Sequence, residues 1–358
     1  MQLIWLSTIC SFNSSAQTIK EPLNLGFPSG LFIPDTIRIC MTGDIMMHSR
    51  QMEYDFRSYF KKMEREFMGS DITIANMEFT LAGEPYTGYP QFSAPDSFAE
   101  HIADSGVDIF LCANNHILDK GSEGAERTLQ QYRSLRETYG VRFTGAASSI
   151  DELESTTPLI IRCREASVAL INFTYGTNLG STAHWPQINY MGQREFLRKA
   201  LHKADSLADF TIVLPHWGDE YQLIHSKTQE ETAEWLVNNG ADLIVGSHPH
   251  VIQEISSVNG VKVAYSLGNA VSNMSAPDTQ LGLTLVVTLI REINGNVRLA
   301  AMEPISTWCS RPGGYCDSYI VIPVEKYKGK KDEWHGVWDY DKMMTTYERV
   351  RNIHKNEQ

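Results

Sequence analysis

From Thr36 onward the chain alternates short apolar runs with longer amphipathic stretches, and this alternation restricts its fold more than any other feature. The apolar runs are rich in Ile, Val and Leu, as expected of buried strands. They predict strands at Ile37–Thr42, Ile72–Ala75, Ile109–Cys112, Leu159–Arg162, Ser167–Phe173, Phe210–Pro215, Leu243–Val245, Val261–Ser266, Leu283–Arg291 and Tyr319–Val324. The amphipathic stretches predict helices at Ser49–Phe67, Ser97–Ser105, Ser122–Tyr139, Gln193–Asp209, Thr228–Asn239 and about Asp341–His354.

Strand–helix alternation of this kind predicts an α/β (α+β layered) protein with a largely parallel or mixed sheet. The pairs Asn259-Gly260 and Asn294-Gly295 indicate hairpins between the later strands. We expect one domain over residues 37–310, followed by a C-terminal strand and helix extension over 311–358. Since no apolar run reaches the roughly 18 residues that span a bilayer, the chain does not look like an integral membrane protein.

Residues 1–16 resemble a signal peptide. Leu3 to Phe12 is a short apolar run, and Ser14-Ser15-Ala16 forms a small-residue cleavage site. The usual positive start is missing, because the first basic residue is Lys20. The prediction is an exported protein, periplasmic or extracellular at the envelope; the alternative is a disordered N-terminal extension.

The chain is acidic, with 31 Lys and Arg against 43 Asp and Glu, a formal net charge of −12. This balance argues against a nucleic-acid partner bound through its phosphates. It would also repel a polyanion, except where metal or local basic residues reverse the field.

Six cysteines are present. Cys40, Cys112 and Cys163 lie in apolar runs and are expected in the core. Cys309 and Cys316 flank a Gly/Pro-rich turn, where a local disulfide would suit an exported protein. The sequence leaves that pairing open.

The most informative pattern is that metal-capable side chains follow one predicted strand after another. The residues are Asp44, Asn76, Glu78, Asn114, Asn115, His116, Asp119, His216, Glu220, His248, His250 and Asn269. Because ligands bind outside the carboxyl ends of strands in open α/β sheets, we expect these side chains to meet at one edge. Carboxylates, imidazoles and amide oxygens suit two adjacent divalent cations, which could activate water and neutralise a phosphoryl or acyl oxygen.

Some of these residues have an ordinary structural alternative. Asp44 and Asp119 could cap helices, and Asn114 and Asn115 could be turn residues. The pair His248-Pro249-His250 at a strand end favours ligands over packing.

Taken together, these motifs resemble the CapA (PGA_cap) family. They are Gly43-Asp44, Asn76-Met77-Glu78, Ala113-Asn114-Asn115-His116 with Asp119 and Gly121, His216-Trp217-Gly218 with Glu220, Gly246-Ser247-His248-Pro249-His250-Val251, and Tyr265-Ser266-Leu267-Gly268-Asn269. The resemblance implies a metallophosphatase-like β-sandwich core flanked by helices. It also implies a part in making or exporting a capsular polymer such as poly-γ-glutamate.

By the same resemblance, the metal ligands are Asp44, Glu78, Asn115, His216, His248 and His250, holding two divalent ions of Mn, Fe, Zn or Mg. His116 matches the histidine that protonates the leaving group, and Asn115 and Glu220 complete the catalytic set. Glu220 and Asn76 are further candidates for support or additional ligation. One departure is plain: metallophosphatases usually have Asp-x-His, whereas Ile45 and Met46 follow Asp44.

Three functions remain open at this point. The first is a metal-dependent hydrolase or transferase acting on phosphoester or γ-glutamyl bonds of an envelope polymer. The second is a non-catalytic accessory subunit that binds the polymer or a membrane synthase through a Tyr/Trp-rich C-terminal part. The third is a stand-alone secreted metallophosphatase with a small-molecule substrate.

Overall fold

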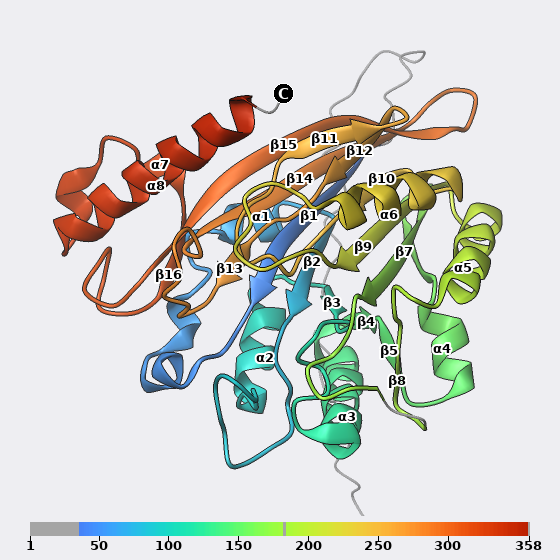
Figure 1. Ribbon diagram of the computed structural model, residues 1–358, viewed down its shortest axis with the longest axis horizontal. Coiled ribbons are helices and arrows are strands. Elements are labelled where there is room, and N and C mark those ends of the chain that lie inside the picture. The colour runs from blue at the N-terminus through green and yellow to red at the C-terminus, as the bar shows by residue number, and fades with distance from the viewer. Residues whose placement is uncertain (1–35, 182–183, 357–358) are drawn as a thin grey trace, which may run out of the picture. The chain divides into compact units, whose positions relative to one another are not determined.

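The computed structural model describes residues 36–181 and 184–356, in which two β-sheets stack face to face with helices on their outer sides (Figure 1). The predicted signal peptide at residues 1–16 lies outside the described residues. None of the described helices is long and apolar enough to cross a membrane.

The larger sheet has eight strands in the order β16-β15-β14-β1-β2-β3-β4, with β13 also pairing with β1. The strands β1, β2, β3 and β4 run parallel, whereas β14, β15 and β16 add antiparallel neighbours on the other side of β1. Their bounds are β1 Thr36–Ile45, β2 Ile72–Met77, β3 Ile109–Leu111, β4 Arg142–Thr144, β13 Asn269–Val271, β14 Leu281–Arg291, β15 Val297–Ser310 and β16 Ile320–Pro323.

The second sheet has six strands in the order β11-β12-β10-β9-β7-β6. Its central strands β7, β9, β10 and β12 are parallel, and the edge strands β6 and β11 are antiparallel to their neighbours. The bounds are β6 Leu159–Cys163, β7 Ala166–Thr174, β9 Phe210–His216, β10 Leu243–Val245, β11 Ile255–Val258 and β12 Val261–Ala264; a separate pair joins β5 Ala146–Ala147 to β8 Gln187–Ile188.

Successive side chains of a strand alternate between the cluster that separates the two sheets and the cluster under the outer helices. In β7, Val168 and Leu170 belong to the hydrophobic cluster between the sheets, while Ala169 and Ile171 face the opposite side. The central cluster also takes Ile39 and Met41 of β1, so the two sheets share one core. Because successive side chains of a strand point to opposite faces, each strand can serve this core and a helical layer at once.

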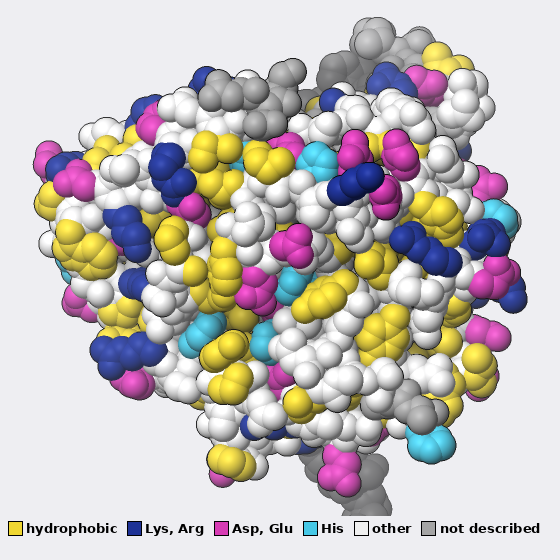
Figure 2. All heavy atoms as spheres, viewed as in Figure 1, with side chains coloured by type: hydrophobic (Ala, Val, Ile, Leu, Met, Phe, Trp, Pro, Cys, Tyr) yellow, Lys and Arg dark blue, Asp and Glu magenta, His cyan; other side chains and the backbone are white. Residues whose placement is uncertain are grey.

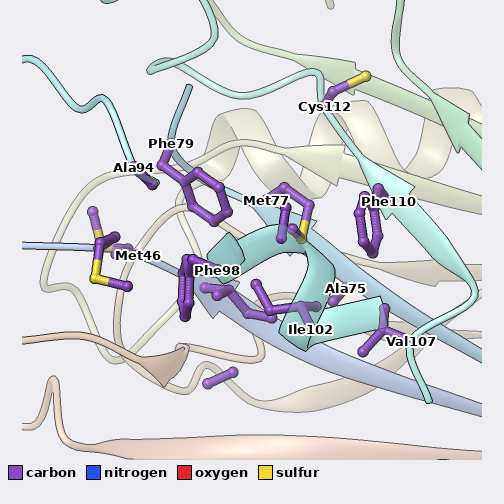
Figure 3. Packing of buried hydrophobic residues seen from close by; sticks show 14 of the residues in the cluster. Met46, Ala75, Met77, Phe79, Ala94, Phe98, Ile102, Val107, Phe110 and Cys112 are labelled. Carbon is purple, nitrogen blue, oxygen red and sulfur yellow. The ribbon is translucent and has the colours of Figure 1, made fainter. Parts of the chain in front are cut away.

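Helices cover the outer faces of both sheets. α1 Glu64–Met68, α2 Asp96–Asp104 and α3 Gly121–Tyr139 pack on the larger sheet, and α5 Arg194–Leu207 and α6 Lys227–Asn238 pack on the smaller one. Figure 3 shows Phe98 and Ile102 of α2 pointing toward Met77 of β2, with Met46 in the same cluster. The short helices α4 Ile150–Thr156 and α7 Val324–Tyr327 and the 3-10 turn η3 Lys331–Glu333 lie in connections.

The predicted helix at Ser49–Phe67 is wrong. That stretch forms the 3-10 turns η1 Ser49–Glu53 and η2 Phe56–Ser58 before α1 begins at Glu64. Side chains compete with the helical backbone here: Gln51 bonds the backbone of Met46 and His48, and the Asp55 carboxylate accepts the Arg57 N–H. The apolar residues of the second half of the stretch are buried, and Met52, Tyr54 and Phe56 pack half-buried against the same cluster, so the apolar spacing reflects contact with the core and not a continuous helix.

The other predicted helices and strands are present, with ends shifted by a few residues. The two hairpin predictions are confirmed, since Asn259 and Gly260 join β11 to β12 and Gly295 lies between β14 and β15. The long strand β15 was not predicted. Its first half is an open edge with alternating exposure, because β16 pairs only with Thr307–Ser310.

The disulfide that the sequence left open does not form, as Cys309 and Cys316 are both free. Cys309 is buried in the cluster on the outer face of the larger sheet, whereas Cys316 packs against the cluster between the sheets. Residues on opposite faces cannot be bridged without moving the backbone. Cys40 and Cys112 are buried, as expected, and Cys163 is half-buried.

The segment after residue 310 supplies β16 and the helix α8 Val337–Asn356, which packs over β14 and β15. Asp339 in the first turn of α8 is fully buried and accepts a hydrogen bond of 2.6 Å from Ser310 Oγ. Gln280 Nε2 lies 3.5 Å from the same carboxylate. Asp339 therefore ties the helix to the sheet; the domain boundary at residue 310 stays a prediction.

Replacing Asp339 with Ala should lower the free energy of unfolding by about 1–3 kcal/mol, because Ser310 Oγ loses its buried partner. Chemical denaturation monitored by circular dichroism measures this change. Asp341→Ala is the matched control: its side chain is 57% exposed and pairs with Lys331 at the surface, so the loss should stay below about 1 kcal/mol. Equal losses in the two variants would contradict the anchoring role of Asp339.

Candidate metal centre

The carboxyl ends of strands from both sheets meet at one place, and the predicted ligands lie there. The larger sheet supplies acids and an amide: Asp44 at the end of β1, Glu78 directly after β2, and Asn115 after β3. The smaller sheet supplies imidazoles: His216 at the end of β9, and His248 and His250 after β10. All six side chains are buried. Strand ends separated by more than 200 positions in sequence thus form one site, as predicted.

Two groups of these side chains have the spacing of metal ligands. Asp44, Glu78 and His216 form one group, and Glu78, His248 and His250 form the other, with the ligand atoms of each group within 4.8 Å of one another. Glu78 belongs to both, and its Oε1 lies 3.8 Å from His216 Nε2 and 3.7 Å from His250 Nε2. Asn115 Oδ1 adds a neutral oxygen 2.8 Å from His216 Nε2.

Two atoms in these groups have no hydrogen-bond partner among residues 36–181 and 184–356. Glu78 Oε1 and His248 Nδ1 are buried and make no hydrogen bond within the described residues. A buried polar atom without a partner is costly, whereas a divalent cation would satisfy both atoms at once. The donor set of carboxylates, imidazoles and an amide oxygen fits such an ion.

The backbone holds these side chains in unusual positions. His248 and His250 both have positive φ, at 103° and 58°, a conformation that non-glycine residues adopt at a cost. At Gly43 a Cβ would lie 1.9 Å from the carbonyl oxygen of Gly268, so only glycine lets β13 approach β1 here. That approach allows the Asp44 N–H to donate to Gly268 O at 2.9 Å and directs the Asp44 carboxylate into the site.

Neighbouring amides and hydroxyls orient the ligands. Asn76 Nδ2 donates to Asp44 Oδ1 at 2.7 Å, which makes Asn76 a support for the carboxylate. Asn269 Oδ1 lies 2.9 Å from His250 Nδ1, and Ser247 Oγ lies 2.9 Å from His216 Nδ1. These contacts leave Nε2 of each imidazole facing Glu78, the arrangement that partners of metal-binding histidines usually impose.

The sequence profile of the bacterial capsule synthesis protein PGA_cap family matches residues 38–274, which include every ligand candidate. The chain belongs to this family. It is 28% identical over 252 residues to the capsule biosynthesis protein CapA of Bacillus anthracis and 27% identical over 254 residues to the PGA biosynthesis protein CapA of Bacillus subtilis. Each match covers 66% of this chain but only 60% and 63% of the relatives' own lengths.

Among solved structures, the PGA_cap chain resembles a Staphylococcus aureus protein provisionally assigned as a 5'-nucleotidase, solved with alpha-ketoglutarate. The TM-score is 0.52 at 13% identity, over 75% of this chain and 54% of that chain. The likeness shows the fold, which is metallophosphatase-like, as expected.

Met46 stands where metallophosphatases usually carry a histidine, and it does not face the site. Its side chain is 1% exposed and packs in the hydrophobic cluster with Phe98 and Met77 (Figure 3). The nearby His48 does not replace it, because His48 Nδ1 lies 3.1 Å from Gln51 Oε1 and belongs to neither ligand group.

His116 lies beside the ligand groups with its own partner. Its Nδ1 is 2.7 Å from Asp119 Oδ2, which also accepts the Phe92 N–H at 2.8 Å. The Phe92 ring meets the imidazole edge-on at 4.7 Å, and His116 Nε2 lies 4.0 Å from Glu78 Oε1. Asp119 therefore orients His116 and does not cap α3, whose preceding residue is Lys120.

Glu220 occupies a different position from the other predicted residues. It is exposed, in the loop after β9, and belongs to neither ligand group. The negative charge of Glu220 nevertheless acts on the site, because it contributes to the raised pKa of Glu78. Its catalytic role stays a prediction.

Burial shifts the pKa values of the ligand candidates in directions that suit cation binding. It raises the pKa of Glu78 well above its usual value, and the charges of Asp44 and Glu220 add to that rise. It lowers the pKa of His216 and His248, with neighbouring imidazoles acting in the same direction. The imidazoles are therefore neutral and able to ligate, while the Glu78 carboxylate needs a positive charge beside it.

Tyr175 and Asn178 were missed by the sequence reasoning. They lie in the loop after β7, where Tyr175 packs 4.5 Å from the His248 ring and Asn178 Nδ2 lies 3.4 Å from His116 Nδ1. Neither residue is a typical ligand, so the search for metal-capable side chains passed over them. The rule that strand ends carry function, applied to the predicted strand at Ser167–Phe173, would have pointed to this loop.

Glu78→Gln should reduce bound divalent metal to a small fraction of the wild-type content, because both ligand groups lose their shared charge. Elemental analysis of the purified protein measures the content. The matched control is Glu66→Gln: Glu66 is also buried with one unpartnered oxygen, but it lies in α1 and pairs with Lys326. Metal lost equally from both variants, or from neither, would contradict the assignment of Glu78.

Proposed function

We propose that this PGA_cap protein is a metal-dependent hydrolase or transferase that acts on phosphoester or γ-glutamyl bonds during the metabolism of an envelope polymer. The observation that carries the proposal is the sharing of Glu78 between two ligand groups, with its buried Oε1 unpartnered and His116 4.0 Å away. A purely structural site has no need for an oriented histidine beside the cage.

Asp44, Glu78, Asn115, His216, His248 and His250 would hold two divalent ions of Mn, Fe, Zn or Mg. When bound, the ions would supply Lewis-acid chemistry, stabilising charge on a phosphoryl or acyl oxygen and making water a better nucleophile. Because Met46 offers no imidazole, we expect the two positions to differ in affinity.

His116 would deliver a proton to the leaving group. The Asp119 carboxylate lies 2.7 Å from His116 Nδ1, so the imidazole is held with Nε2 turned toward Glu78 and the site. Asn178 contacts the same ring, and its Oδ1 accepts a hydrogen bond of 3.4 Å from Asn115 Nδ2. Asn178 therefore connects His116, the proposed proton donor, to the proposed ligand Asn115. The chain thus supplies proton transfer and orientation independently of the cation.

The context of the reaction is proposed from the relatives, which are named for capsule and PGA biosynthesis. A poly-γ-glutamate-type polymer, export to the envelope and cooperation with membrane synthase subunits all belong to this proposal. The alternative of an accessory subunit docking through the Tyr/Trp-rich C-terminal part has less support. Tyr319, Tyr327 and Trp334 of that part are buried in the core, although Trp338 is exposed.

The function is tested by loading the full chain with Mn, Fe, Zn or Mg and assaying phosphoesters and γ-glutamyl peptides side by side. Metal-dependent turnover of one class supports the proposal and identifies the bond. If the metal-loaded protein turns over neither class and instead co-purifies with membrane subunits, the accessory reading is correct.

His116→Ala should lower kcat about 10²–10⁴-fold, because the leaving group loses its proton donor. The metal content should be unchanged, since His116 belongs to neither ligand group. Steady-state kinetics and elemental analysis on the same sample measure both quantities. His202→Ala, an exposed position on α5, is the control and should retain wild-type turnover. Wild-type kcat in the His116 variant would remove this residue from the mechanism.

A further inference from the structure

A pocket of about 370 Å³ lies where β4, the last strand of the larger sheet, comes next to β6, the last strand of the smaller sheet. Its lining residues are Arg142, Ile160, Arg162 and Leu207. Arg142 begins β4, and its guanidinium donates to Ile160 O of β6 at 2.8 Å. Arg162 comes two residues after Ile160 in β6 and therefore shares its strand face, while Leu207 ends α5. We name this site the arginine pocket.

The two arginines of the pocket have no carboxylate partner. Among residues 36–181 and 184–356, neither Arg142 nor Arg162 forms an ion pair, and the Arg142 side chain bonds only a backbone carbonyl. Other half-buried arginines of the chain do have such a partner, since Arg127, Arg133 and Arg291 each lie within 3.1 Å of a carboxylate oxygen. The positive charge of the arginine pocket is thus left uncompensated by side chains of the described part of the chain.

Burial and a like charge both act against the cation of Arg142. Its side chain is half-buried, and the pKa of Arg142 is lowered first by burial and then by the positive charge of Arg136, with no carboxylate acting on it. Arg136 is exposed in the last turn of α3 and has no ion pair in the part of the chain that the structure describes. A guanidinium carries five N–H donors, so an anion in the pocket would satisfy free donors and offset the repulsion.

The arginine pocket lies at the other end of the sheets from the metal centre. Arg162 pairs with Ser167 near the start of β7, whereas Thr174 at the end of β7 pairs with the ligand candidate His216. Seven steps along a strand, from Ser167 to Thr174, cover about 23 Å. The pocket is therefore separate from the metal ligands and does not belong to their site.

The charge of the whole chain gives this pocket its meaning. A net charge of −12 repels a polyanion from most of the surface. Figure 2 shows one face with histidines near its middle among hydrophobic and acidic side chains, and with Lys and Arg farther out. A chain of carboxylates therefore needs local positive charge where it contacts the protein. A bound cation would supply it at the metal centre, and arginines without acidic partners supply it at the arginine pocket.

We propose that the arginine pocket, together with Arg136, binds a polycarboxylate chain and holds it away from the metal centre. The arginines come from three elements, α3, β4 and β6, which favours a ligand with several carboxylates over one small anion. The planar guanidinium matches a carboxylate through two parallel hydrogen bonds. That the same chain also reaches the metal centre rests on the proposed function. The binding itself does not, because it needs neither metal nor turnover.

The test is isothermal titration of the full chain, stripped of metal, with poly-γ-glutamate oligomers at low and at high salt. The oligomers should bind at low salt and be released at high salt, because salt screens exposed charges. Arg162→Ala and Arg136→Ala should each weaken binding about three- to tenfold, and Arg162→Glu should weaken it further, because repulsion replaces a charge-assisted hydrogen bond. Both positions are exposed, so circular dichroism should show wild-type folding.

Arg351→Ala is the matched control. Arg351 is also exposed and has no ion pair among the described residues, but it lies on α8, which packs over β14 and β15 on the other side of β1 from β4. This variant loses the same charge and should bind the oligomers as the wild type does.

The proposal is overturned if the oligomers do not bind the metal-free chain, or if the Arg162 and Arg136 variants bind as tightly as the wild type. It is equally overturned if Arg351→Ala weakens binding as much, or if polyphosphate binds and poly-γ-glutamate does not. Assays of the metal-loaded protein separate this proposal from the proposed function. Arginine-dependent binding without turnover supports the pocket and refutes the hydrolase, whereas turnover without such binding does the reverse.

Discussion

The negative charge of Glu78, sealed between two sheets, is the constraint on which the rest of the site depends. A carboxylate removed from water costs several kcal/mol or more unless positive charge or hydrogen bonds surround it, and Oε1 of Glu78 has no hydrogen-bond partner in the part of the chain that the structure describes. Burial lowers the pKa of both His216 and His248, so these imidazoles do not supply that charge. The site is therefore built for a cation, and the close approach at Gly43 and the positive φ of His248 and His250 hold it in that arrangement.

The division of ligands between the sheets explains why the fold has two of them. The larger sheet contributes acids and an amide, and the smaller sheet contributes imidazoles, so neither sheet forms the cage alone. Their relative position is set by the hydrophobic cluster between them, which includes Met41 directly before the ligand-bearing end of β1. Packing in this core thus fixes the distances between the acidic ligands of the larger sheet and the imidazole ligands of the smaller sheet. Beside these ligands, His116 with its partner Asp119 extends the same site outward.

Strands were easier to predict than the segments that join them. Buried runs such as Ile72–Ala75 carry their own signal because both faces of the strand meet apolar neighbours. The stretch Ser49–Phe67 was wrongly predicted as one helix, because its apolar spacing comes from contact with the core. The side chains of Gln51 and Asp55 form hydrogen bonds with the backbone there and interrupt the helix. The strand β15 was not predicted, because half of it is an open edge with exposed polar residues. The spacing of Cys309 and Cys316 could not decide whether they pair, because it does not show which hydrophobic cluster each sulfur joins.

The sequence by itself determined the layered fold, the family and the identity of the ligand candidates, because strand periodicity and the residues that follow each strand are local properties of the chain. The tertiary structure alone decided that Glu78 is shared by two groups, that Asp119 orients His116 instead of capping a helix, that Met46 turns into the core, and that Tyr175 packs against His248. Those facts depend on distances and burial between segments far apart in sequence. Such distances are set only when the two sheets pack against each other.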